Sequence, residues 1–571
     1  MRIHVVIPLG FLLAGCASIE PPEPKDNLIH VKVWPNQGTQ YQFPERQTTD
    51  PLLYQPVTGK TGICFSGGGT RALSATAGQL RGLIASGLLK DVDYISCVSG
   101  GSWACTAFTY YRAGAANDAQ FLGPAIEPEK ITMENLNELD VHALGYTATA
   151  DFKQPFIGDI FNSKAAVDTA WIRAVGQTFF ESFGLYDPDN PSYFSLNKKT
   201  VNDIKTRNPS LAAAPFHIVR NKSGEVKRPY LVINSCVIWP VDDKKEENTV
   251  SFEYTPLYVG SAYNLTLTRP RAFKPALSRE VGGGLYESFA MGSTAPANFD
   301  LPEGSAHVLE PGVPFTLVDA SGASSSAFAR ALDRYTAVLS PHSNTWSIKD
   351  ATPGETWFDA FGDGANVENY GLISLMRREL DRIVVFVNTP VKLDMAYDPG
   401  DGNSVLPPED GQIDSNLPPF FGVSQTKKGK PDNPYPNNQV FSSSDYPAVV
   451  KGLQAARRSG GPVTVTTDLV TRENLWWGIP AGQKMKITWV YLDRTARWED
   501  QLDPAIENEI TNGNAAKPTG PFLRFPNYKT IGEDKGKLVS MTKPEVNLLG
   551  HLAYWTVMNS DEIRQTIQGT E

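Results

Sequence analysis

The stretch of sequence from residue 62 to residue 99 has the pattern of a strand, a helix and a second strand. The runs GICFS (62–66) and VDYISCVS (92–99) are apolar and contain β-branched residues. Two strands joined by a helix of this length lie parallel in one sheet, with the helix packed on a face. The helical segment is indicated by apolar residues at near-helical spacing: Leu73, Leu80, Leu83, Ile84 and Leu88.

Three more β-branched runs follow and alternate with helical patterns, at 228–239, 382–389 and 486–493. The alternation predicts an α/β fold with a mostly parallel central sheet and helices on both faces. Residues 113–225 and 240–340 are longer than a simple crossover needs, so we expect cap or lid insertions there.

Pro, Gly, Asn and Asp are frequent in residues 391–445, and this composition predicts a long surface excursion. Within it, YDPGDGNS (397–404) lacks the alternating ligands and closing Glu of a calcium loop, so we expect a solvated loop.

The N-terminus has the features of a bacterial lipoprotein signal. Residues 1–15 hold one basic residue and then an apolar stretch too short to span a bilayer, and LAGC resembles a lipobox. We expect cleavage before Cys16, lipidation of Cys16 and, since Ala17 follows it, outer-membrane localisation. Residues 16–50 are then a lipid-anchored tether and N-terminal extension. The alternative is an ordinary signal peptide with a chance cysteine.

The net charge argues against a nucleic-acid-binding protein, and the spacing of the cysteines argues against a metal site. The formal net charge is −10 with acidic and basic residues intermixed, so nucleic acid is not an expected partner. The remaining cysteines lack the paired spacing of a metal site, and we expect buried thiols without an obligatory disulfide. They are Cys64, Cys97, Cys105 and Cys236.

Three consecutive glycines, Gly67–Gly69, follow the first predicted strand directly and precede the helix. Such a run lets backbone N–H groups converge, and the helix N-terminus adds partial positive charge. The site suits a phosphate or an acyl-transfer oxyanion, and a tight structural turn is the alternative. The sequence fits neither the P-loop nor the dinucleotide-binding motif.

Ser99 ends the second strand in the sequence YISCVSGGSW. The usual nucleophile elbow is G-x-S-x-G, and here Cys97 replaces its first glycine. A right-handed crossover would bring Ser99 beside the glycine run, and Gly100 would supply one more N–H group. The alternative is a polar residue in an ordinary turn.

The predicted base is Asp363, in a D-G-A turn after an apolar stretch. None of the seven histidines has a distinctive catalytic setting. A plain turn is one alternative. The other is a triad in the order Ser99, Asp363, His551, although NLLGHLAYW reads as an apolar helix with His551 in the core.

Together these motifs resemble the catalytic domain of cytosolic phospholipases and fungal lysophospholipases (phospholipase B), which is related to patatin-like lipases. The resemblance covers roughly residues 55–395, so we expect residues 51–571 to be a catalytic domain with the two cap insertions. Its motifs are SGGGTRA (66–72), VSGGSW (98–103), DGA (363–365), FEYTPLYVGS (252–261) and FAMGSTAPANF (289–299).

The resemblance implies a Ser–Asp dyad without histidine, metal or other cofactor. Ala365 stands where the family has a second glycine, a change that patatin-like lipases share. The roles carried over are nucleophile for Ser99, base for Asp363, oxyanion donors for Gly68 and Gly69 with Gly100, and a lipid-phosphate contact for Arg71. For Arg71 the alternative is a structural arginine bonded to nearby carbonyls or a carboxylate.

The implied activity is hydrolysis of fatty-acyl esters of phospholipids or lysophospholipids through an acyl-enzyme, at a membrane reached through Cys16. An envelope acyltransferase with the same dyad and a non-catalytic lipid-binding lipoprotein are the alternatives. Two aromatic clusters could line an acyl pocket, touch membrane or belong to the core. They are Trp476 with Trp477, and Phe179, Phe180 with Phe183.

Overall fold

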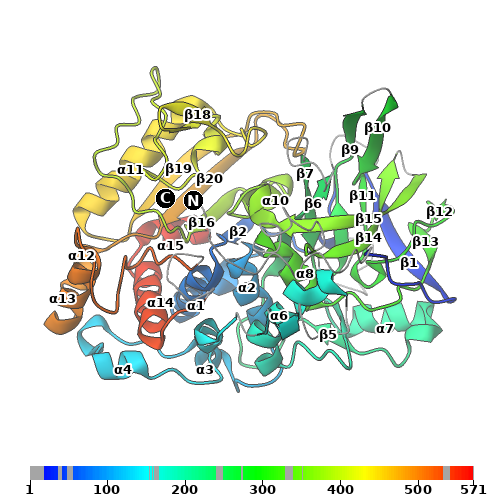
Figure 1. The fold of residues 1–571 in the computed structure, drawn as a ribbon, viewed down its shortest axis with the longest axis horizontal. Coiled ribbons are helices and arrows are strands. Elements are labelled where there is room, and N and C mark those ends of the chain that lie inside the picture. Colours follow the sequence, from blue (N-terminus) through cyan, green and yellow to red (C-terminus); the bar gives the residue numbers. More distant parts are fainter. Residues whose placement is uncertain are drawn as a thin grey trace, which may run out of the picture.

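The computed structural model gives the fold of most of the chain (Figure 1). The predicted signal peptide and Cys16 lie outside the described residues. Within the described part, no helix has the length and apolarity needed to cross a membrane. The described residues are 19–36, 41–47, 56–152, 155–156, 158–159, 166–239, 248–271, 274–327, 339–349, 352–530 and 540–569.

The described residues include one mixed sheet of 14 strands. Twelve of them follow the order β12-β13-β1-β11-β8-β7-β6-β3-β2-β16-β20-β19, while β15 pairs with β6 and β14 pairs with β15. Their bounds are β1 Leu28–Pro35, β2 Thr61–Phe65, β3 Tyr94–Val98, β6 Tyr230–Trp239, β7 Asn248–Tyr254, β8 Tyr258–Ser261, β11 Gly284–Glu287, β12 Phe299–Asp300, β13 Ser305–Leu309, β14 His342–Lys349, β15 Thr352–Asp363, β16 Arg382–Val387, β19 Thr464–Val470 and β20 Lys484–Tyr491.

The parallel part of this sheet is made of β6, β3, β2, β16 and β20, which are neighbours in that order. These are the five runs that the sequence predicts as strands, so the predicted α/β core is confirmed. Phe65 pairs with Cys97, and Val98 pairs with Asn234. The carboxyl ends of β2, β3 and the middle of β6 therefore meet at one level.

The remaining strands extend the parallel core in the antiparallel sense. β7, β8, β11, β1, β13 and β12 continue it on the β6 side, and β19 closes the other edge. Three further pairs are separate: β4 (Tyr193–Ser195) with β5 (Phe216–Ile218), β9 (Leu265–Arg271) with β10 (Lys274–Val281), and β17 (Gln425–Lys427) with β18 (Lys430–Asp432).

Helices cover both faces of the sheet because side chains alternate along each buried strand. Ile63 and Phe65 face one apolar core, which includes residues of α1, α2, α6, α8, α13, α14 and α15, whereas Cys64 faces a second core with α10 and α11. The helix bounds are α1 Gly69–Ala85, α2 Gly100–Tyr110, α3 Asp118–Leu122, α4 Met133–Asn137, α6 Ala170–Phe179, α7 Lys198–Arg207, α8 Leu317–Ser324, α10 Leu372–Arg377, α11 Tyr446–Ser459, α12 Ala496–Glu499, α13 Pro504–Gly513, α14 Lys543–Met558 and α15 Asp561–Gln568.

Helix α1 follows the three glycines Gly67–Gly69, here called the glycine loop, and α14, from near the other end of the sequence, packs against α1 (Figure 1). The two helices approach closely at Gly78, where an added Cβ would lie 2.2 Å from the carbonyl oxygen of Gly550. Glycine is required there by this close approach. Helix α14 thereby fixes the position of α1.

Two predictions of chain organisation need correction. β1 lies inside the sheet between β13 and β11, and Glu45 pairs with the buried Arg378, so the expected boundary at residue 50 is not a structural boundary. Residues 391–445 are a surface excursion only in part: residues 401–404 and 427–430 are exposed, whereas Phe420 and Phe421 are fully buried beside Trp489 in the second core. Because the segment is rich in Pro and Gly, its composition did not reveal these few apolar residues that pack in the core.

The two segments expected to form caps differ in structure. Residues 113–225 contain α3, α4, α6 and α7 with one small β-pair, whereas residues 240–340 contribute β7, β8, β11, β12 and β13 to the central sheet. The second segment also holds α8, which reaches the predicted nucleophile.

Candidate active site

Ser99 lies at a sharp turn between β3 and α2. Its backbone has φ 50° and ψ −125°, a left-handed conformation that a residue with a side chain rarely adopts. Strain of this kind costs about 1–3 kcal/mol and persists only where surrounding contacts hold it. Here the Ser99 N–H donates to Ser324 Oγ at 3.0 Å, and the Ser102 N–H donates to the Ser99 carbonyl at 2.8 Å. The turn has the sharp strand-to-helix geometry that the predicted nucleophile elbow requires.

Cys97, which replaces the usual first glycine, does not crowd this turn. It is fully buried within β3, and its Sγ donates to the carbonyl of Val232 on β6 at 3.4 Å. The tight backbone lies two residues later, at Ser99. The other predicted buried thiols, Cys64, Cys105 and Cys236, are also buried, and none of the four is in a disulfide.

The glycine loop contacts the elbow, as the right-handed crossover predicts. An added Cβ at Gly67 would lie 2.9 Å from Ser99 Cβ, and one at Gly100 would lie 2.0 Å from the Gly69 carbonyl oxygen. Gly68 and Gly69 have φ values of 143° and 58°. Because α1 and α2 begin at Gly69 and Gly100, their first N–H groups have no acceptor within the helix. Two helix N-termini therefore meet beside Ser99.

Asp363 is the last residue of β15, and its carboxylate accepts the hydroxyl hydrogen of Ser99. The distance from Ser99 Oγ to Asp363 Oδ2 is 2.9 Å, and Oδ1 accepts the Ala365 N–H at 2.8 Å. The side chain is 2% exposed. Burial raises the pKa of Asp363 to about 6, against the lowering effect of these hydrogen bonds. A carboxylate with a raised pKa is a stronger base than an exposed aspartate.

His551 is not part of this site. It lies within α14, is 3% exposed, and burial together with Arg81 lowers its pKa to about 3. Its Nδ1 has no hydrogen-bond partner among the described residues. Nothing in the described structure joins His551 to Ser99 or Asp363, so the triad alternative is not formed.

Arg71 has the contacts of a structural arginine, because its guanidinium is bonded to nearby backbone carbonyls. Its guanidinium donates from Nε to the Asn388 carbonyl at 3.0 Å and from Nη1 to the Tyr528 carbonyl at 2.6 Å. The residue is 4% exposed, and burial lowers its pKa to about 10. Its Nη2 packs under the glycine loop, 2.4 Å from where a Cβ of Gly68 would be. The guanidinium is thus committed to backbone carbonyls beside the predicted oxyanion donors.

The aromatic clusters belong mostly to the core. Phe179 is fully buried and stacks on Trp103 of α2, and Phe180 and Phe183 are also fully buried. Trp477 is 2% exposed and donates from Nε1 to Asn438 Oδ1, while Trp476 is half-buried. A group of three or more side chains able to hold a metal ion does not occur among the described residues.

Three polar residues that the sequence did not reveal hold the two site loops. Ser324 at the end of α8 accepts the Ser99 N–H and donates to the Asn234 carbonyl at 2.6 Å. Tyr435 donates its hydroxyl to the Ala365 carbonyl at 2.9 Å, and Asn438 donates to the Val367 carbonyl at 2.7 Å. Each is remote in sequence from the loop that it holds, and no local pattern marks it.

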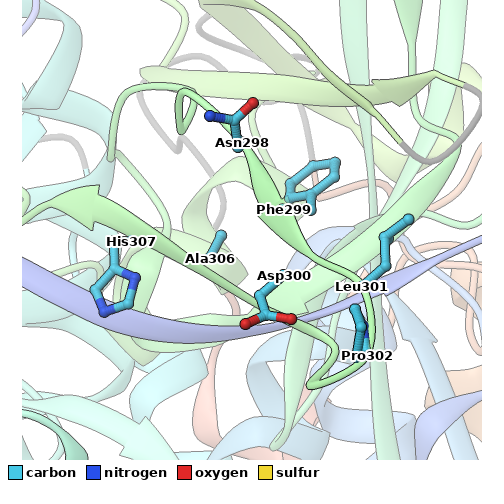
Figure 2. A pocket seen from close by; sticks show the side chains of 7 residues that line it. All are labelled: Asn298, Phe299, Asp300, Leu301, Pro302, Ala306 and His307. Carbon is cyan, nitrogen blue, oxygen red and sulfur yellow. The ribbon is translucent and has the colours of Figure 1, made fainter.

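A surface hollow lies elsewhere, at the β12–β13 hairpin (Figure 2). The hollow has a volume of about 510 Å³ and is open to solvent, and none of the site residues described above lines it. β12 is at one end of the sheet order, seven strands from β3 on the path that links them, and β13 is next to it. Its lining is Asn298, Phe299, Asp300, Leu301, Pro302, Ala306 and His307.

Comparisons with known proteins agree with the phospholipase resemblance over part of the chain. No family model matches the sequence. A stretch of 164 residues, 28% of the chain, is 28% identical to human cytosolic phospholipase A2 zeta, and a stretch of 170 residues is 28% identical to the mouse protein. The chain is distantly similar to cytosolic phospholipase A2. The match spans only 18% of the length of each relative.

The similarity of this chain to solved structures is weaker. Human GIVD cytosolic phospholipase A2 aligns with 92% of this chain and 62% of its own, at 14% identity and a TM-score of 0.43. The same protein in complex with methyl gamma-linolenyl fluorophosphonate aligns with 95% of this chain and 66% of its own, at 15% identity and a TM-score of 0.43. The fungal branch of the resemblance and the lipoprotein signal stay predictions.

Proposed function

We propose that this protein is a serine acyl hydrolase that cleaves fatty-acyl esters of phospholipids or lysophospholipids. The observation that carries the proposal is the 2.9 Å hydrogen bond from Ser99 Oγ to the buried carboxylate of Asp363, at a strained elbow beside the glycine loop. A nucleophile, a base within hydrogen-bond reach and adjacent backbone donors are the groups that acyl transfer needs.

In the proposed reaction, Ser99 Oγ attacks the ester carbonyl carbon while its proton passes to Asp363 Oδ2. The carbonyl oxygen becomes an oxyanion that the N–H groups of Gly68, Gly69 and Gly100 stabilise. Collapse of this intermediate breaks the ester C–O bond, and the leaving alkoxide takes the proton from Asp363. Water then attacks the acyl-enzyme with Asp363 again as base, which releases the fatty acid and restores Ser99.

The substrate class is supported by the distant similarity to cytosolic phospholipase A2. Arg71 gives it little additional support, because two of its guanidinium nitrogens already donate to backbone carbonyls. An acyltransferase with the same dyad would differ only in the acceptor of the acyl group. A non-catalytic lipid-binding protein would retain the fold without turnover.

The experiment is a panel of lipid esters with mass-resolved products, run on wild type, Ser99→Ala and the control Ser86→Ala. Ser86 follows the end of α1 and is partly exposed. We expect a tagged fluorophosphonate to label wild type and Ser86→Ala, and Ser99→Ala to lose both labelling and turnover. Labelling that survives in Ser99→Ala would contradict the assignment. Acyl transfer to an added alcohol in preference to water would favour the acyltransferase.

We further propose that the protein is anchored in the bacterial outer membrane through lipidated Cys16. The support is the lipobox-like LAGC that precedes residue 17. Two or more acyl chains give stable anchoring. Incorporation of labelled fatty acid should require Cys16, so Cys16→Ser should lose the label and accumulate precursor. An unchanged lipid label would rule out this anchor.

A further inference from the structure

A C-terminal segment, residues 525–530, crosses the carboxyl ends of two core strands and reaches the glycine loop. Asn527 donates from Nδ2 to the carbonyls of Thr389 and Leu492, at 3.1 and 2.8 Å, just after β16 and β20. The Tyr528 carbonyl accepts Arg71 Nη1 at 2.6 Å. Residues more than 450 positions away in sequence are thereby placed against the start of α1.

The last described residue of this segment, Thr530, bonds to the glycine loop directly. Its Oγ1 donates to the carbonyl oxygen of Gly68 at 3.0 Å, and the residue is 6% exposed. The other donor to this carbonyl is the Ala72 N–H at 3.4 Å, a longer contact. The hydroxyl of Thr530 is therefore the closer of the two bonds that orient the Gly68 carbonyl within the described structure.

The orientation of this carbonyl also sets the direction of the next N–H group. In a planar trans peptide the C=O of one residue and the N–H of the next point in opposite directions. A donor on the Gly68 carbonyl therefore directs the Gly69 N–H away from Thr530. Gly68 and Gly69 have no Cβ to restrict rotation of this peptide, and both have positive φ. An external hydrogen bond is what such a peptide needs to hold one orientation.

We propose that Thr530 is a positioning residue for the oxyanion hole, which orients the Gly68–Gly69 peptide so that the Gly69 N–H faces the reacting carbonyl. The inference rests on the proposed acyl hydrolase function. Removal of a whole oxyanion donor typically lowers kcat by about 10²–10³-fold. Loss of orientation leaves the donor present, so a smaller loss, of about tenfold, is expected.

The test compares Thr530→Val, which removes only the hydroxyl, with Thr530→Ser, which retains it. Thr147→Val is the matched control, because Thr147 is 5% exposed and likewise donates to one backbone carbonyl, that of Leu144 at 2.8 Å. We expect Thr530→Val to lower kcat about tenfold on a p-nitrophenyl ester with KM unchanged. Thr530→Ser and Thr147→Val should stay near wild type.

A second readout separates orientation of the donor from general stability. The sulfur of a thionoester accepts N–H hydrogen bonds poorly, so its hydrolysis gains less from the oxyanion hole than hydrolysis of the matched oxygen ester. Thr530→Val should therefore lower the ratio of kcat/KM for ester to kcat/KM for thionoester. A merely structural role would slow both substrates alike and leave this ratio unchanged.

The proposal is overturned if Thr530→Val keeps wild-type kcat, or if it loses activity equally on both substrates. It is also overturned if Thr530→Val and the smaller Thr530→Ala both fail to fold, since the bond would then serve stability. Failure of the proposed function looks different: turnover would persist in Ser99→Ala or be missing from wild type, whatever residue 530 is.

Discussion

Replacement of Asp363 by Asn should stabilise the protein at neutral pH while abolishing turnover. Asn retains the acceptor for the Ala365 N–H and can bond the Ser99 hydroxyl through its amide, so the local contacts survive. It removes the charge, and the buried site disfavours that charge. The variant thus separates the cost of ionising Asp363 from the packing of its side chain.

The magnitude follows from the pKa of Asp363, which burial raises from 3.8 to about 6. Each unit of difference between folded and unfolded states is worth about 1.36 kcal/mol, so ionised Asp363 costs about 3 kcal/mol. Because the folded pKa is the higher one, the folded state binds more protons between pH 3.8 and 6. The stability that protonated Asp363 provides is complete below pH 3.8 and is lost as the pH rises through 6.

Urea unfolding of wild type and Asp363→Asn across pH 4 to 8 would measure this effect. We expect the free energy of unfolding of the variant to exceed that of wild type by about 3 kcal/mol at pH 8, with the difference shrinking towards pH 4. Asp359→Asn is the control, since Asp359 is buried against Arg279 and its neutralisation should destabilise the protein at pH 7. An Asp363→Asn variant less stable than wild type at pH 8 would refute the argument.

Three further outcomes follow from the described contacts. Because Asp363 must be ionised to accept a proton, kcat/KM should rise with pH through about 6 and then level off; a profile flat from pH 5 to 8 would exclude this base. His551→Gln should keep kcat/KM within about twofold of wild type, since His551 contacts neither reacting group in the described structure; loss of activity in a folded variant would restore the triad. Glu45→Gln removes one of the two carboxylates that pair with the buried Arg378, and the other, Glu253, is shared with Arg377, so a buried positive charge is left uncompensated and the free energy of unfolding should fall by about 3–5 kcal/mol, measured by urea denaturation; a change under 1 kcal/mol would contradict this placement.

The parallel core of the fold was predictable from the sequence because its signals are local. Each of the five core strands is a short apolar run, and a buried parallel strand must be apolar on both faces. The antiparallel extension was not predictable in the same way. β1 pairs with β13 and β11, which are some 250 residues further along the chain, and its own sequence alternates only as any half-buried strand would.

The residues of the candidate site also divide into those that local sequence motifs predict and those that they do not. Ser99, Asp363 and the glycine loop stand in short motifs, and right-handed crossover explains why two of them meet. The groups that hold these motifs are single polar side chains from distant segments: Ser324 and Tyr435 on the elbow and base loops. A serine or tyrosine at such a position carries no local pattern, because its role depends only on which backbone group the fold brings near.

Arg71 shows how the fold bears on two roles that the sequence left open. Its place at the start of α1 suits either a phosphate contact or a structural role, and the carbonyls that bind it come from Asn388 and Tyr528, 317 and 457 residues away. No ion pair to a carboxylate is formed by Arg71 in the described part of the chain; the negative charge of Asp414 acts on it from a distance, and burial still lowers its pKa. That charge lies under Gly68, beside the donors proposed for the oxyanion. If Ser99 acts as proposed, a buried cation without an ion-pair partner there favours the transition state, in which negative charge develops, over the neutral ester, without any contact to a lipid phosphate.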